Sequence, residues 1–179
     1  MNKTKHTLTY ELTGIIFIIT LGTILHFTFE WSGNQAVVGI FSAVNESVWE
    51  HLKLGFWPAT LFTLIEYQQL KSNSNFLTAK TTSIYLIPTT ITAIFYSYTA
   101  ILHETILAID ILTFIIAVII GQLASYKLLT WKTLPPNLNK IALTALILLC
   151  LAFVLFTFYP PHIEPFQDPI TGTYGISSQ

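Results

Sequence analysis

Residues 45–53, which read NESVWEHLK, form the densest group of chemically useful side chains in the sequence. They include two carboxylates, Glu46 and Glu50, together with His51, Lys53 and the amide of Asn45. One interpretation makes Glu46 or Glu50 a general base and His51 a metal ligand or an acid. The alternative is an ordinary helix start, in which Asn45 caps the helix, the dipole favours the acidic residues and Glu50 pairs with Lys53.

Imidazoles and carboxylates recur in two further segments of the chain. His26 and Glu30 are four residues apart and therefore share one face of a helix. His103 and Asp110 are seven residues apart, which again places them on one face. Zinc and iron accept both imidazole nitrogen and carboxylate oxygen. We therefore predict a site for a divalent metal, zinc or iron, in which Asp110 orients the ligands. The predicted ligands are His26, Glu30, His51 and His103.

Each of these residues also has a structural interpretation. Glu30 could lie among lipid headgroups while His26 bonds a neighbouring helix, and His103 could mark a helix boundary. Asp110 lies in an otherwise apolar run, where an ionised carboxylate costs several kcal/mol unless it is paired. It requires a proton, a metal, or a partner such as Lys53, a histidine or a hydroxyl group.

The composition indicates a membrane protein. The chain has 179 residues, of which 53% are hydrophobic and 9% are charged, and its mean hydropathy is +0.62. Soluble domains carry about a quarter charged residues, so a soluble core cannot absorb this much apolar surface. The net charge of −1 and the absence of arginine argue against nucleic-acid binding. Cys150 is the only cysteine, which excludes an intrachain disulfide.

Several apolar runs reach about 20 residues, the length that crosses a bilayer. They predict an all-α membrane bundle in a single domain, with five spans at about 12–31, 48–69, 76–102, 104–128 and 140–158. Residues 36–44 are too few to cross alone and predict an interfacial or re-entrant segment. Pro58 predicts a kink in the second span. Residues 159–179 are expected to form an extracytoplasmic tail, in which turn-forming pairs favour a flap over a ligand loop.

The lysines outside the predicted spans alternate from one connection to the next. The N-terminal segment and the connections near residues 71–75 and 130–139 carry them, the other connections and the tail carry none, and Lys53 is the one exception. The positive-inside rule therefore predicts a cytoplasmic N-terminus and an outer C-terminus, in a multi-pass protein of the cell membrane. This orientation gathers the predicted site in the outer leaflet and leaves Glu11 and Glu66 as ordinary inner-boundary residues.

Three motifs together resemble a known family: residues 45–53, His26-x-x-x-Glu30-Trp31, and the C-terminal stretch FTFYPPH…DPITGTYG. The family is a domain-of-unknown-function family of short polytopic membrane proteins, found mainly in Gram-positive bacteria. The resemblance covers essentially the whole chain and implies a bacterial membrane protein without an assigned activity.

The residues Asn45, Glu46 and His51, followed by Leu52-x-x-Gly55, are also similar to the adiponectin-receptor and alkaline-ceramidase membrane hydrolases, which depend on zinc. The chain departs from that pattern in having about five spans rather than seven, a shorter Asn-to-His spacing, and no paired histidines in its last span. No catalytic assignment is therefore carried over.

Three functions fit these observations. The first is a metal-dependent membrane hydrolase that acts on a lipid or lipid-linked substrate at the outer leaflet. The second is a carrier, or a subunit of a transport complex, that binds a cation, proton or small solute; with five spans it would need a homo-oligomer or a membrane partner. The third is a structural or sensory protein in which the charged cluster ties helix ends together. All three expect membrane lipids as neighbours and no nucleic acid.

Overall fold

The computed structural model describes residues 3–176, and these residues form a bundle of helices, which confirms the predicted all-α class. The long helices are α1 (Lys3–Trp31), α3 (Val48–Leu70), α4 (Phe76–Leu102), α5 (Leu107–Thr130) and α6 (Asn137–Phe158). A single turn, α2 (Ala36–Gly39), separates α1 from α3, and a short 3-10 helix, η1 (Glu164–Phe166), follows α6. The last three residues of the predicted tail, 177–179, lie outside the described residues.

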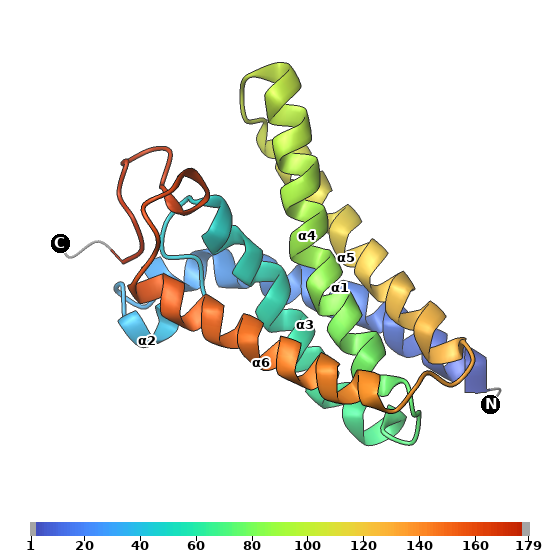
Figure 1. The fold of residues 1–179 in the computed structure, drawn as a ribbon. Helices are drawn as coiled ribbons and strands as arrows, with labels where there is room; N and C mark the ends of the chain where they lie inside the picture. Colours follow the sequence, from blue (N-terminus) through green and yellow to red (C-terminus); the bar gives the residue numbers. More distant parts are fainter. Residues whose placement is uncertain (1–2, 177–179) are drawn as a thin grey trace.

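The two ends of the bundle differ, and we name them for what they contain (Figure 1). The amino end holds the start of α1 and the connections 71–75 and 131–136. The tail end holds the end of α1, the start of α3 and residues 159–176. The α4–α5 hairpin projects beyond the rest of the tail end (Figure 1).

The predicted helix boundaries agree with the structure to within three residues, with one exception. Helix α1 begins at Lys3 rather than near residue 12. The predicted span begins after the polar N-terminal residues, because it was located from hydropathy. In the structure the polar Thr7 and Glu11 are buried, at 4% and 0% exposure, and the helix continues through them.

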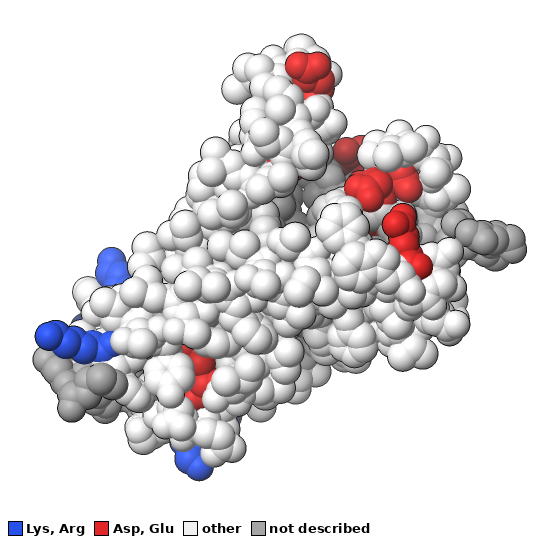
Figure 2. Space-filling model, turned by 180° about the vertical axis from the view of Figure 1, so that it is seen from behind, with Lys and Arg blue, Asp and Glu red and all other residues white. Residues whose placement is uncertain are grey.

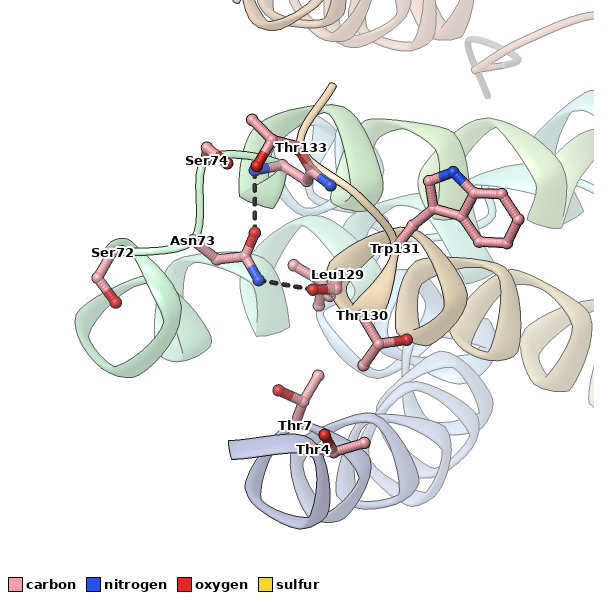
Figure 3. A pocket seen from close by; sticks show the side chains of 10 residues that line it. Thr4, Thr7, Ser72, Asn73, Ser74, Leu129, Thr130, Trp131 and Thr133 are labelled. Carbon is pink, nitrogen blue, oxygen red and sulfur yellow. Dashed lines mark hydrogen bonds between the residues drawn. The ribbon is translucent and has the colours of Figure 1, made fainter. Parts of the chain in front are cut away.

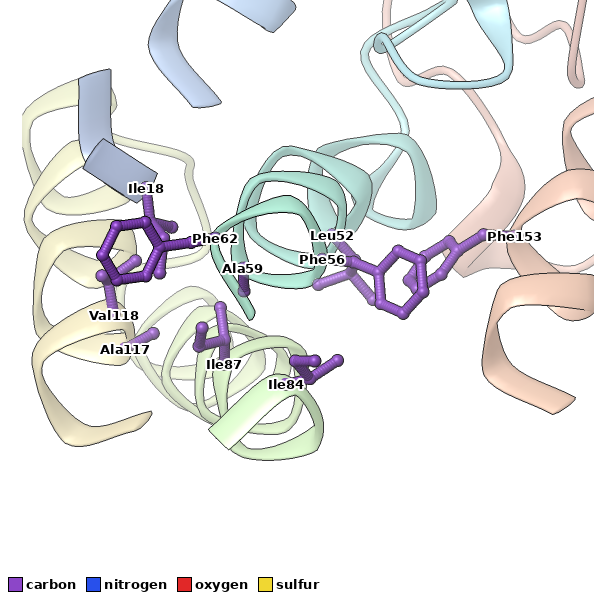
Figure 4. Packing of buried hydrophobic residues seen from close by; sticks show 10 residues of the cluster. All are labelled: Ile18, Leu52, Phe56, Ala59, Phe62, Ile84, Ile87, Ala117, Val118 and Phe153. Atoms are coloured by element: carbon purple, nitrogen blue, oxygen red, sulfur yellow. The ribbon is translucent and has the colours of Figure 1, made fainter. Parts of the chain in front are cut away.

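Helix α3 is the centre of the fold. Leu52, Phe56, Ala59 and Phe62 lie along its length and are all buried. They pack against apolar side chains from every other long helix, as Figure 4 shows. These neighbours are Ile18 of α1, Ile84 and Ile87 of α4, Ala117 and Val118 of α5, and Phe153 of α6.

The start of α3 is capped by Ser47, whose hydroxyl accepts a hydrogen bond from the amide of Glu50 at 3.4 Å. The prediction that Asn45 caps this helix is therefore wrong. The Asn45 side chain instead accepts from the amide of Ser47 at 2.9 Å, which shapes the turn before the helix. Either side chain could cap a helix, and the backbone conformation of the loop decides between them.

Four helices, α1, α4, α5 and α6, are long and apolar enough to cross a membrane. Their outward faces carry exposed apolar side chains such as Ile16, Leu107, Ile141 and Leu148. Helix α3 is of similar length but carries Glu50, Lys53 and Glu66, and it does not meet the same apolar criterion. The structure thus supports a membrane protein with four apolar spans, while the fifth span and the orientation remain predictions.

Charged side chains are segregated between the two ends of the bundle. The exposed lysines Lys71, Lys127, Lys132 and Lys140 all lie at the amino end, where α3, α4, α5 and α6 begin or finish. Figure 2 shows the visible lysines at this end and most of the visible carboxylates at the other, with one acidic patch among the lysines. The asymmetry is the one that the positive-inside rule uses.

Candidate functional site

Three potential ligand atoms converge where the end of α1 meets the start of α3. The Nε2 atoms of His26 and His51 lie 3.2 Å apart, and Glu46 Oε2 lies 3.4 Å from His51 Nε2. One ligand atom of each residue lies within 4.8 Å of the others. His26 comes from α1, Glu46 from the loop 40–47 and His51 from α3.

Hydrogen bonds fasten the loop 40–47 to α1 one turn from His26. Ser42 is fully buried, donates to the carbonyl of Leu25 and accepts from the amide of Phe29 at 3.0 Å. Near the other end of the loop, Glu50 Oε2 accepts from the amide of Val44 at 3.1 Å. The loop that presents Glu46 is therefore anchored on both sides.

The backbone carbonyl of Ser47 fixes the tautomer of His51. This oxygen lies 2.9 Å from His51 Nδ1, and because a carbonyl only accepts, Nδ1 must carry the hydrogen. In the neutral imidazole, Nε2 then presents its lone pair toward His26 and Glu46. Metal-ligating histidines are held in the same way, through a hydrogen bond from the second ring nitrogen.

Two of the three separations between the ligand atoms fit a tetrahedral zinc ion, and the third is within 4.8 Å. Zinc lies about 2.0–2.1 Å from histidine nitrogen and about 2.0–2.2 Å from carboxylate oxygen, so neighbouring ligand atoms of a tetrahedron are about 3.3 Å apart. The two separations at His51 Nε2, 3.2 Å and 3.4 Å, bracket this value. Three protein ligands leave a fourth position free, as in catalytic zinc sites.

A pocket of about 190 Å³ opens beside the three residues. His26 and Glu46 line it, together with Phe27 and Glu30 of α1 and the loop residues that precede Glu46. When His51 is protonated on both nitrogens, its Nε2–H contact lowers the pKa of the Glu46 carboxyl below its ordinary value. A metal ion bound here would take the place of that proton. The site thus combines an anionic ligand, two imidazoles and room for a small group.

A family model described as "Family of unknown function (DUF6512)" matches residues 1–176. The chain belongs to this family. The match confirms the prediction of a domain-of-unknown-function family, and it covers all but the last three residues. No curated protein and no solved structure matches the chain. The family description assigns no activity, so the function of this DUF6512 member has to be argued from its own residues.

The structure brings only some of the predicted site residues together. His26, Glu46 and His51 form the group, with Glu46 in a ligand position rather than that of a base. Glu30 lines the pocket but lies outside the group. Glu50 turns away from it and pairs with Lys53, 2.5 Å away. The Glu50–Lys53 ion pair of the second interpretation is therefore present in the structure.

The expected convergence of His103 and Asp110 on this group is not observed. His103 is exposed and ends α4 with a left-handed backbone (φ 58°). It lies at the tip of the projecting α4–α5 hairpin (Figure 1). Asp110 accepts a short hydrogen bond from the hydroxyl of Tyr98 within the same hairpin. The prediction that the two residues share one helix face is also wrong, because His103 ends α4 and Asp110 lies in α5, with a non-helical connection between them.

The tail is a folded, turn-rich segment that contacts the start of α3. Asp168 Oδ1 accepts from the amide of Ile170 at 2.7 Å, and the ring of Phe166 stacks on Trp49 at 4.7 Å. Asn45 donates to the carbonyl of Gly175 at 3.1 Å. Burial raises the pKa of Asp168, but three backbone hydrogen bonds outweigh it, and the net pKa is lowered. The tail thus holds residues 45–49 from the side opposite to α1.

The sequence analysis missed a second cluster near the amino end. Lys80 Nζ lies 2.5 Å from both Glu11 Oε1 and Glu66 Oε2, and all three side chains are 1% exposed. Glu11 and Glu66 had been interpreted as inner-boundary residues. Lys80 is the fifth residue of an apolar helix, and a lysine inside a span requires an anionic partner. Its position in the sequence could therefore have predicted this cluster.

Proposed function

We propose that this DUF6512 protein is a five-span membrane protein whose His26–Glu46–His51 group binds zinc or iron and serves the hydrolysis of a lipid or lipid-linked substrate. The observation that carries the metal site is the spacing of the three ligand atoms around His51 Nε2. The tautomer that Ser47 imposes on His51 supports the same proposal, since it presents the lone pair to the site.

The length and packing of α3 support a fifth span. At 1.5 Å per residue, its 23 residues extend about 34 Å, which exceeds the hydrocarbon thickness of about 30 Å. Its charges are shielded from lipid, because Lys53 pairs with Glu50, and Glu66 with Lys80, in buried positions. The exposed lysines at the amino end then favour a cytoplasmic amino end and an outer tail end in the cell membrane.

The surroundings of the pocket support a lipid-derived substrate. Phe27 lines the pocket while 44% of it is exposed, and its ring stacks on Trp31, which is 70% exposed. An exposed aromatic pair beside a site near a helix end suits the membrane interface. A substrate could therefore reach the pocket from the bilayer with its headgroup toward His26.

The residues divide the expected chemistry between them. A divalent ion held by the group would polarise a carbonyl or phosphoryl oxygen as a Lewis acid. Glu30 is exposed and lines the pocket without being a ligand, so it can accept a proton from an attacking water. Ser47 keeps the His51 ring oriented, and Ser42 keeps the loop of Glu46 in place.

The test is the metal content of detergent-purified protein, prepared without chelators and measured by inductively coupled plasma mass spectrometry. We expect close to one zinc or iron per chain in the wild type, and a loss of at least about tenfold in His26→Ala and His51→Ala, since even outer-shell changes cost 10–100-fold in affinity. The matched control is His103→Ala, an exposed histidine outside the group, which should keep its metal.

Hydrolysis is tested separately on the metal-loaded protein in liposomes of bacterial lipids, with products followed by mass spectrometry. Turnover in the wild type that is lost in Glu30→Gln, while the metal is retained, would support the assignment of Glu30. A metal-free wild type that is folded would refute the metal site, and metal without lipid turnover would refute the hydrolase. The carrier alternative that joined Asp110 to the outer cluster is not retained, because Asp110 bonds Tyr98 instead.

A further inference from the structure

The cluster near the amino end carries one more negative charge than positive charge. Lys80 is the only cation that pairs with Glu11 and Glu66 among the described residues, and it contacts both carboxylates. The three side chains come from α1, α3 and α4, and each is 1% exposed. If all three were ionised, a net charge of −1 would be buried, at a cost of several kcal/mol.

The two carboxylates are also close to each other. Because one oxygen of each lies 2.5 Å from the same Lys80 Nζ, those two oxygens are no more than 5 Å apart. Carboxylates at such distances do not both ionise readily, and one of them retains a proton. Glu11 Oε2 and Glu66 Oε1 are buried and have no hydrogen-bond partner among the residues that the structure describes. Either atom can therefore carry the proton without breaking an existing contact.

The hydrogen bonds indicate which carboxyl group is protonated. Glu11 Oε1 accepts from Lys80 and also from the hydroxyl of Ser125 at 2.9 Å, and two donors favour the ionised form. Glu66 has the Lys80 contact alone. Helix α5 contributes Ser125 and, one turn away, Gln122, whose side-chain carbonyl accepts a hydrogen bond from the hydroxyl of Ser83 at 3.2 Å. The nearest other titratable groups on α1, His6 and Tyr10, contact each other.

A polar pocket lies at the amino end, beside helices that carry this cluster. It has a volume of about 300 Å³ and is lined by residues from the start of α1 and from the two connections at this end, mostly threonine, serine and asparagine. Figure 3 shows their side chains around the cavity. Thr7 lines it and precedes Glu11 by one helical turn, and Leu129 lines it and follows Ser125 by one turn. A turn is about 5.4 Å, so the lining residues Thr7 and Leu129 lie about one turn along their helices from Glu11 and Ser125.

From the charge count, the burial and the adjoining pocket, we infer that Glu11, Lys80 and Glu66 form a binding site for one exchangeable proton, which enters and leaves through the pocket at the amino end. Glu66 carries the proton, while Glu11 and Lys80 form the permanent ion pair. This inference does not depend on the metal site, which lies at the opposite end of the bundle.

Infrared spectroscopy of the liposome-reconstituted protein tests the proposal. The wild type should show the carbonyl stretch of a protonated carboxyl group at neutral pH, and the band should shift when the buffer is changed to D₂O. Glu66→Gln removes the excess charge with little change in shape, so it should fold and lose the band. The matched control is Glu104→Gln, an exposed carboxylate at the hairpin tip, which should keep it.

Three results would overturn the inference. A wild type without the band at neutral pH would mean that both carboxylates are ionised. Stabilisation of that band-free protein by sodium ions would identify a metal cation as the occupant. A band that does not respond to D₂O in the folded protein would mean that the pocket gives no access. Each of these is observed on the wild type, so none depends on whether a variant folds.

Discussion

Replacing Lys53 by methionine should destabilise the protein by about 3–5 kcal/mol, because it leaves the Glu50 carboxylate buried without its cation. Lys53 Nζ lies 2.5 Å from Glu50 Oε2 and also donates to the Gly39 carbonyl at 2.6 Å and the Thr157 hydroxyl at 2.9 Å. The two charged side chains are 0% and 2% exposed, so water cannot replace the lost contacts. Methionine fills much of the same volume, so the loss is mainly electrostatic.

The assay is the free energy of unfolding in mixed detergent micelles, measured for the wild type, Lys53→Met and the double variant Lys53→Met/Glu50→Gln. The double variant should recover part of the loss, since neither charge remains. Lys132→Met, an exposed lysine at the amino end, should stay within about 0.5 kcal/mol of the wild type.

The same variant reports on the metal site, because Glu50 Oε2 also accepts from the amide of Val44 in the loop that carries Glu46. Lys53→Met should therefore lower metal occupancy as well as stability. A loss of under about 1 kcal/mol, the range of an exposed pair, would refute the reasoning. It would mean that water reaches the pair or that Glu50 is neutral.

Three further predictions concern the tail and the metal. The pKa of Asp168 is lowered in the folded protein, so the contribution of Asp168 to tail docking is complete above the ordinary aspartate pKa and is lost as pH falls through the lower folded pKa. The fluorescence of Trp49, which stacks on Phe166 of the tail, should report undocking in acid. Asp168→Asn should flatten that pH profile. Gly175→Ala should accelerate limited proteolysis of the tail, because φ at Gly175 is +58° and the new Cβ would lie 2.8 Å from the Thr157 carbonyl oxygen. Gly33→Ala is the control: φ at Gly33 is +71° but the space around it is open, so the tail should be cleaved at the wild-type rate. Zinc binding to the wild type, measured by isothermal calorimetry, should weaken by about tenfold or more per pH unit below the ordinary imidazole pKa of about 6.5, because protons compete for the ring nitrogens; an affinity that does not change with pH would place the metal elsewhere.

The helices themselves could be predicted almost completely. Spans of about 20 apolar residues interrupted by Ser-Asn and Pro-Pro connections fix helix positions locally, and the boundaries of α3, α4 and α6 agree with the structure. The start of α1 could not be located by the same signal. Thr7 and Glu11 look like an aqueous approach to the membrane until Lys80 supplies the partner that allows Glu11 to be buried.

The site was predictable in kind but only partly in membership. The mixture of histidines and carboxylates near helix ends predicted a metal site, and His26 and His51 belong to the group that could hold an ion. The roles of Glu46 and Glu50 could not be assigned, because Glu46 lies in the loop before α3 and Glu50 in its first turn, and the conformation of that loop decides that Glu46 faces His51 while Glu50 faces Lys53. His103 was included for its residue type and its spacing from Asp110, but it lies in the connection that ends α4 and is not part of the group.

The sequence by itself determined that this protein is helical, that it suits a membrane, and that it carries histidines and carboxylates where helices end, because these properties follow from composition and from the spacing of residues along single helices. Only the tertiary structure decided which charges meet. The pairs Glu50–Lys53 and Glu66–Lys80 are both buried, yet the second joins helices α3 and α4. Pairing between helices depends on their rotation and depth, which local periodicity does not specify. For that reason the cluster of Glu11, Lys80 and Glu66 became visible only in the folded chain.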